Sequence, residues 1–242
     1  MLLLAILLVL LNIFPTEYRK DGSRLPSCKR SARSSADQHL HKIINESCQM
    51  LTTAYRIVHG EPIKINKGDP PHPVQRWEVD MMTYVHSRWP EMGRDIDASK
   101  YSRPVRKTHV NHPMSVWVRT SRTNFFWVCQ YAMELCKEHE RRPLSTGKSS
   151  TPHMYRPHIE WFSSHLPKTT LFPAKGLTVM PLCMADECKS ADSDPVISYR
   201  AWVSKKYSTV RVIKGSTKQS HVIDWVRSPH RKPCWLQDLC QE

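Results

Sequence analysis

The chain has 242 residues, of which 36 are Lys or Arg and 22 are Asp or Glu, so its formal net charge is +14. Seven glycines exclude a collagenous chain, and the positive excess excludes an acidic disordered tail. With 40% apolar residues and eight tryptophans, the composition fits one packed domain. The charge favours an anionic partner such as nucleic acid or a membrane surface, although it could also serve solubility alone.

The chain begins with an apolar run of 14 residues, MLLLAILLVLLNIF, which ends at Pro15. A transmembrane helix needs ~20 apolar residues, so this run is too short to span a bilayer comfortably. Three interpretations stay open: an uncleaved anchor or poor signal peptide, a buried helix or strand, and an extension created by the choice of start codon. We divide the chain into an apolar and basic N-terminal segment, 1–33, and a single helical domain, 34–242.

The chain carries eight cysteines, which would allow four disulfides, but a chain of this length needs no disulfide framework. Cys129 and Cys136 lie seven residues apart in an apolar helical pattern, which is typical of core thiols. We therefore expect a reduced protein inside the cell.

The first clear helical pattern runs from Ser34 to Val58, where apolar residues recur with a helical period. Ser34, Ser35 and Asp37 are candidate N-caps, and Gly60 is a candidate stop.

The stretch from Gly60 to Pro113 is rich in proline and charge and predicts surface loop, with one short helix over 79–89. A second strong apolar pattern predicts one long helix from Ser115 to Glu140, followed by a loop over 141–152.

The last third of the chain predicts a short helix over 157–165 and an irregular segment over 171–187. Asp194 and Pro195 are typical of an N-cap and a first helical residue, and this helix continues to Lys206. The tail is basic and aromatic. The expected fold is mainly α, a compact helical domain with long irregular loops.

One pattern is typical of zinc-dependent nucleobase deaminases, which hold zinc with a histidine and two thiolates and use a glutamate to move protons. His158 and Glu160 form an H-x-E pair, and Cys183 and Cys188 follow. The alternative is that these are ordinary thiols, and since the strands that should precede them are weak, the deaminase is the less favoured hypothesis.

A second constellation lies on the first long helix. His39 and Glu46 are seven residues apart, so they project from nearly the same face, ~10 Å apart along the axis, with Lys42 between them. Such a face in a very basic protein suits chemistry on a DNA backbone or sugar, although a solvated polar face is the simpler explanation.

This helix resembles the catalytic helix of the phage pyrimidine-dimer DNA glycosylases that are also abasic-site lyases. A closer resemblance, covering most of the chain, is to a group of uncharacterised small phage and bacterial proteins. These begin Met-Asn-Ile-Phe and carry D-x-H, E-x-x-Q-x-L, N-H-P, W-V-R, M-P-D-E and A-Y-R-A-Y elements. The matching segments here are Asn12-Ile13-Phe14, Asp37-Gln38-His39, Glu46 to Leu51, Asn111-His112-Pro113, Trp117-Val118-Arg119, Met184 to Glu187 and Ser198 to Trp202.

The resemblance implies a protein that uses its N-terminal α-amine, here placed at Asn12, to form a Schiff base with a flipped or abasic nucleotide. Glu46 would move protons, and His39 would position the sugar. The family's arginine before the catalytic glutamate is Asn45 here, and Met1 lies eleven residues before Asn12. Activity would then require processing near Asn12, a substitute amine such as Lys42, or a misassigned start.

The partner that this reading implies is nucleic acid, most of all double-stranded DNA, rather than a membrane. We expect a monomer without metal or cofactor, whose basic residues hold phosphates. A non-catalytic nucleic-acid-binding protein is the main alternative. The candidate DNA contacts are Lys42, Arg106, Lys107, His109, Asn111, His112, Arg119, Arg122 and Arg200.

Overall fold

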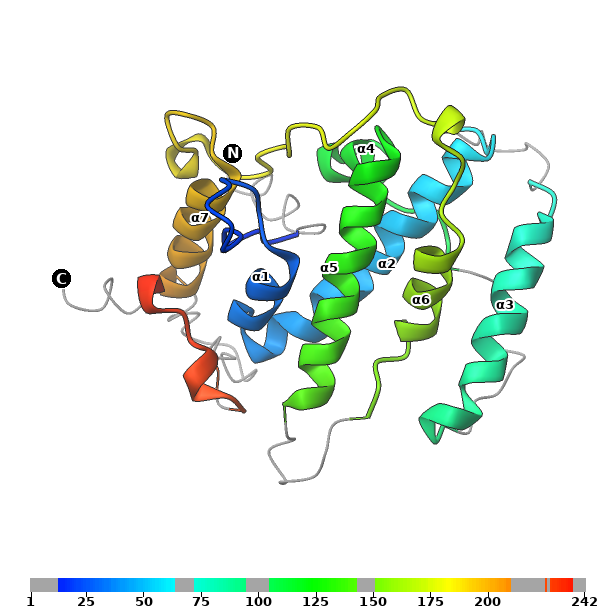
Figure 1. Ribbon diagram of the computed structural model, residues 1–242, viewed down its shortest axis with the longest axis horizontal. Coiled ribbons are helices and arrows are strands. Elements are labelled where there is room, and N and C mark those ends of the chain that lie inside the picture. The colour runs from blue at the N-terminus through cyan, green and yellow to red at the C-terminus, as the bar shows by residue number, and fades with distance from the viewer. Residues whose placement is uncertain are drawn as a thin grey trace, which may run out of the picture.

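The computed structural model describes residues 13–63, 72–94, 105–142, 151–209, 225 and 227–236. Within these ranges the protein is mainly helical, and the only β-structure is two isolated bridges, which confirms the predicted fold class. The helices are α1 (Cys28–Ser34), α2 (Asp37–Val58), α3 (Arg76–Arg88), α4 (Pro113–Val118), α5 (Arg122–Arg141), α6 (Arg156–Ser164) and α7 (Pro195–Thr209). In Figure 1, α2 and α5 lie at the centre, and α3 and α7 lie at opposite ends.

The start of the first predicted helix is corrected by the structure. Ser34 is the last residue of α1, which was not predicted because seven mostly polar residues give no apolar period. The chain turns before α2 begins at Asp37, whose N-cap position is Ala36. Asp37 instead accepts a hydrogen bond from the side chain of Arg142 at 2.8 Å and one from the backbone N–H of Arg227 at 2.8 Å.

The single helix predicted from Ser115 to Glu140 is two helices, α4 and α5. Ser121 caps α5, because its Oγ accepts a hydrogen bond from the Asn124 N–H at 3.0 Å and donates to the Gly176 carbonyl at 2.6 Å. The Asn124 amide donates back to the Trp117 carbonyl at 2.8 Å. The apolar period runs through this break, so periodicity alone could not reveal it.

The remaining helices agree with the predictions to within a few residues. α3 begins three residues early at a capping box in which the Gln75 N–H donates to Glu78 at 2.8 Å. Asp194 caps α7 as predicted, since its Oδ1 accepts the Val196 N–H at 2.8 Å. The irregular segment carries only short 3-10 turns, at Thr169–Leu171 and Asp186–Cys188.

The core fills the space between α2, α5 and the helices beside them. Tyr55 lies at its aromatic centre, with ring centroids 5.4 Å from Trp161 and 5.4 Å from Phe162. Ile13 and Phe14 belong to this same core. The predicted boundary at 33/34 falls inside α1, so the described part of the N-terminal segment packs as part of the helical domain.

Cys129 and Cys136 are core thiols, as predicted. Both are fully buried in α5, opposite Cys48 of α2. Burial raises the pKa of Cys48 to about 12, so this thiol stays protonated at neutral pH. The seven described cysteines are all free.

In the described part of the chain, no helix is both long enough and apolar enough to cross a membrane. Most of the apolar run, residues 1–12, lies outside the described residues.

Candidate active site

One face of α2 carries the three side chains predicted to work together. His39 and Glu46 are buried, with 7% and 6% of their surface exposed, while Lys42 between them is partly exposed. The Nζ atom of Lys42 lies 3.5 Å from Oε1 of Glu46. The helical spacing predicted from the sequence therefore brings an amine onto a buried carboxylate.

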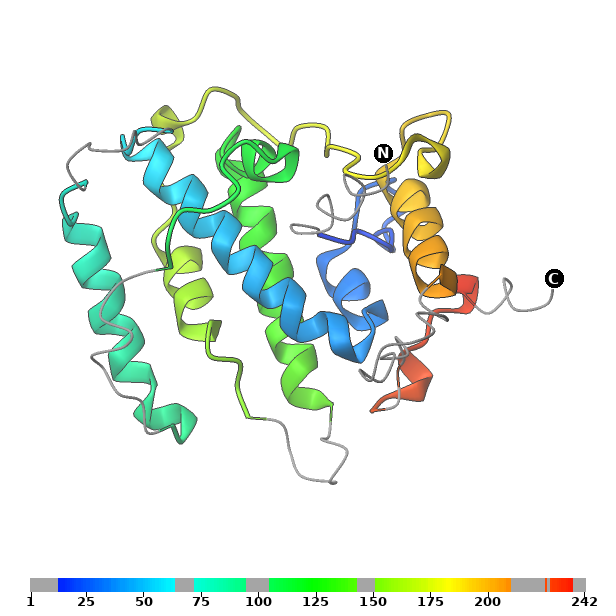
Figure 2. The ribbon, with the colours of Figure 1, turned by 180° about the vertical axis from the view of Figure 1, so that it is seen from behind.

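The N-terminal segment and α7 contribute further side chains to this site. α7 stands beside the N-terminal segment at one end of the molecule (Figure 2). The ring of Phe14 lies 5.6 Å from that of His39 and 5.2 Å from that of Trp202, between centroids. The Nζ atom of Lys206 lies 4.7 Å from the Trp202 ring centre and 5.8 Å from that of Phe14. We call Phe14, His39, Lys42, Glu46, Trp202 and Lys206 the α2–α7 site.

Burial and neighbouring charges lower the pKa of two members of this site strongly. Burial, helped by the positive charges of Lys206 and Lys42, lowers the pKa of His39 to about 3. Burial and the charge of Lys42 lower the pKa of Lys206 to about 8, against an opposing effect of Glu46. At neutral pH the His39 imidazole is therefore uncharged, and about a tenth of the Lys206 amines are neutral.

This arrangement combines the groups that covalent chemistry on a carbonyl carbon requires. A neutral amine can attack the carbon, and a nearby carboxylate can accept or return a proton. An uncharged imidazole can take part in hydrogen bonding without adding a positive charge. Burial, with a small contribution from Glu46, raises the pKa of the Tyr131 hydroxyl, which donates a hydrogen bond to the Phe14 carbonyl at 3.4 Å.

Lys206, Trp202 and Phe14 were not among the residues predicted for the site. Trp202 and Lys206 are four residues apart on a predicted helix, so the sequence indicated that they share a face. Nothing in the sequence indicated that this face meets α2, which only the packing decides.

Asn12, the predicted source of the nucleophilic amine, lies outside the described residues. The described chain begins at Ile13, which is fully buried, and the next side chain, Phe14, contacts His39. Phe14 of this element is therefore part of the site, and the role of Asn12 stays a prediction.

Two of the predicted DNA contacts, Lys107 and Arg200, have internal partners. Lys107 Nζ lies 2.9 Å from a carboxylate oxygen of buried Glu61. Arg200 donates to the Thr16 carbonyl at 2.7 Å and lies 3.2 Å from Glu17, so it fastens the N-terminal segment to α7. These contacts give both side chains a structural role within the fold.

The Asn-His-Pro element lies at the start of α4. His112 caps this helix, accepting the Met114 N–H at 3.2 Å, and burial together with the charge of His109 lowers the His112 pKa. Arg119 donates to the Val110 carbonyl at 2.6 Å and closes the loop before the helix.

The remaining predicted contacts are exposed: Arg106, His109 and Asn111 on the loop before α4, and Arg122 at the start of α5. Arg122 donates to the Pro167 carbonyl at 3.0 Å. It also lines a cleft of about 330 Å³ with Phe126 and Lys175. These exposed groups are not part of the α2–α7 site, and their contact with DNA stays a prediction.

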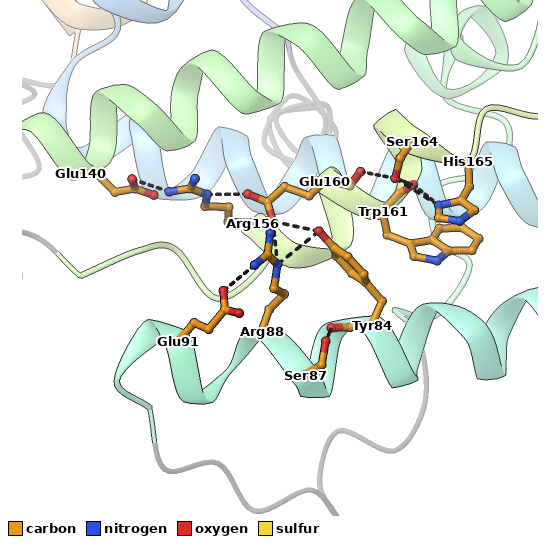
Figure 3. Close-up of polar contacts among 10 residues, drawn as sticks. All are labelled: Tyr84, Ser87, Arg88, Glu91, Glu140, Arg156, Glu160, Trp161, Ser164 and His165. Carbon is orange, nitrogen blue, oxygen red and sulfur yellow. Dashed lines mark hydrogen bonds and ion pairs between the residues drawn. The ribbon is translucent and has the colours of Figure 1, made fainter.

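The residues of the deaminase pattern are used differently. Glu160 accepts a hydrogen bond from Arg156 at 2.8 Å and lies 3.4 Å from the Tyr84 hydroxyl, within a network that links α3, α5 and α6 (Figure 3). Burial lowers the pKa of His158 to about 4. Among the described residues, which include Cys183 and Cys188, no group of three or more His, Cys, Asp or Glu side chains is placed to hold a metal ion.

In comparisons with known proteins, no family model matches the chain, and no curated protein or solved structure matches it. The resemblance to the phage glycosylases therefore stays a prediction from sequence motifs.

Proposed function

We propose that this protein processes DNA as an abasic-site lyase, with the glycosylase activity that the sequence resemblance implies. The observation that carries the proposal is the buried Glu46 carboxylate, which lies 3.5 Å from one amine and interacts with a second whose pKa is lowered. The charge of +14 and the motif resemblance support a DNA substrate.

The reaction proceeds through a Schiff base. A neutral amine adds to C1′ of the opened abasic sugar, and water leaves as the iminium forms. Glu46 then removes a proton from C2′ to give an enamine, and the enamine electrons return to break the C3′–O bond, so that the 3′ phosphate leaves and a conjugated iminium re-forms. Water finally adds to C1′ and frees the amine, so no metal or cofactor is consumed.

The substrate would be held by the exposed basic groups around the fold. Arg106 and Arg122 are suited to bind phosphates, because guanidinium groups form paired hydrogen bonds with phosphate oxygens. Neutral His39 beside Phe14 would position the sugar without repelling the cation that forms at C1′.

The test is a duplex that contains a single abasic site, incubated with the full chain and with borohydride to reduce any iminium. We expect a covalent adduct and strand cleavage. Glu46→Gln should lower cleavage by about 10²- to 10⁴-fold while leaving DNA binding intact. Glu187→Gln, on an exposed 3-10 turn, is the matched control and should cleave as the unaltered protein does.

The alternative is a nucleic-acid-binding protein without catalysis, which the +14 charge alone would favour. That protein would bind DNA with a steep salt dependence, and Glu46→Gln would not weaken the binding. If neither the full chain nor a chain beginning at Asn12 gives an adduct, the lyase proposal is wrong and the non-catalytic binding protein is favoured.

A further inference from the structure

Lys206 has the surroundings of a nucleophilic amine rather than those of a surface lysine. Its Nζ atom lies over the rings of Trp202 and Phe14, and its charge interacts with Glu46 and Lys42 of α2. By contrast, its neighbour Lys205 is 54% exposed and pairs with Glu187 at 2.6 Å. Lys206 therefore lies in a partly apolar environment close to another amine, whereas its neighbour Lys205 lies in an ordinary solvated one.

Two physical effects favour the neutral, reactive form of this amine. Partial burial against aromatic rings removes water from the ammonium, and the positive charge of Lys42 repels it. Lys42 differs in that its side chain is 40% exposed and its Nζ atom lies 3.5 Å from Glu46. Lys42 thus helps to lower the pKa of the Lys206 amine, and the Glu46 carboxylate can accept a proton.

We propose that Lys206 is the amine that forms the Schiff base, with Glu46 as its proton acceptor. This inference rests on the proposed lyase function and names the nucleophile for it. Nζ of Lys206 adds to the aldehyde carbon C1′, and the oxygen leaves as water to give an iminium between C1′ and Nζ. After Glu46 takes the C2′ proton and the 3′ phosphate leaves, hydrolysis returns the amine to Lys206.

The assignment removes the need for a free α-amine at Asn12. A lysine side chain supplies a primary amine wherever the mature chain begins, so neither processing nor a different start codon is required. The assignment also gives the two amines different roles: Lys42 contributes a nearby positive charge, and Lys206 forms the bond to C1′.

The experiment uses the full chain, abasic duplex DNA and borohydride, followed by mass mapping of the modified peptide. We expect the adduct on Lys206, and its loss in both Lys206→Met and Lys206→Arg. The arginine variant keeps the positive charge over the Trp202 ring but cannot form an iminium, so it separates nucleophilicity from charge. Lys205→Met is the matched control and should give the adduct in full yield.

The outcomes separate the inference from the function on which it rests. An adduct that persists in both Lys206 variants, or that maps to Lys42 or the N-terminus, would overturn the role of Lys206 while keeping the lyase. An adduct that is absent from the unaltered full chain would overturn the role of Lys206, and its absence from the chain beginning at Asn12 as well would overturn the lyase.

Discussion

Two clusters of partly buried charge lie at opposite ends of the helical body, and the pKa values of Arg156 in one and of Lys206 in the other are shifted in opposite directions. In the interhelical network of Tyr84, Arg88, Glu140, Arg156 and Glu160, Arg156 lies 2.5 Å from Glu140 and 2.8 Å from Glu160 (Figure 3). In the α2–α7 site, Lys206 shares Glu46 with a second amine.

The balance of charges accounts for the difference. Burial lowers the pKa of a cation in both places, but hydrogen bonds to Glu160 and Glu140 outweigh it at Arg156 and raise the pKa. At Lys206, burial and Lys42 act together and lower it to about 8. Two carboxylates around one cation raise its pKa and favour a structural ion pair. Two amines that share one carboxylate leave one amine with a lowered pKa.

Among the effects that follow from this comparison, the largest is expected for the pH dependence of cleavage. Because the ammonium form of Lys206 cannot attack, the rate should rise about fifty-fold between pH 6 and pH 8 and level off above the pKa of about 8. Single-turnover cleavage of an abasic duplex at constant ionic strength measures this profile.

The variant Lys42→Met sharpens that test. The charge of Lys42 lowers the pKa of Lys206, so its removal should move the break in the profile to higher pH. A profile that does not move would point to an amine remote from Lys42, and complete loss of the adduct would point to Lys42 itself.

A smaller effect is expected on stability, and it should differ between the two clusters. Arg156→Met leaves two carboxylates facing each other and should lower the free energy of unfolding by about 1–3 kcal/mol. Lys206→Met should leave it unchanged or raise it at pH 7, since a folded-state pKa of about 8 means that the charged form opposes folding below pH 8, and that this penalty is relieved as the pH rises from there to the ordinary value of 10.5.

Urea unfolding followed by tryptophan fluorescence compares the two variants. Equal destabilisation by both would show that Lys206 contributes to the fold as Arg156 does, and the contrast between the clusters would fail.

The smallest effect is expected at the edge of the network. Arg88 pairs with Glu91, but both side chains are largely solvated, at 41% and 62% exposed. Glu91→Gln should therefore change the free energy of unfolding by less than about 0.5 kcal/mol in the same urea experiment. A loss as large as that of Arg156→Met would mean that the network acts as one cooperative unit out to its rim.

Local signals in the sequence were sufficient for several helices. The apolar period defined α2, and the Asp194-Pro195 pair located the start of α7, because a cap and an apolar stripe act over one or two turns. The break between α4 and α5 was missed because it depends on Ser121 and Asn124 bonding to the distant segment at Gly176 and Thr178.

The sequence by itself determined that His39, Lys42 and Glu46 share one helical face, since the helical repeat places them there in any fold that keeps α2. Only the tertiary structure decided that Lys206 completes this face while Lys107 and Arg200 bind internal partners. The physical reason is that a pKa or an ion pair depends on the immediate surroundings of a group, and packing brings Glu46 and Lys206, 160 positions apart in the chain, close enough to interact.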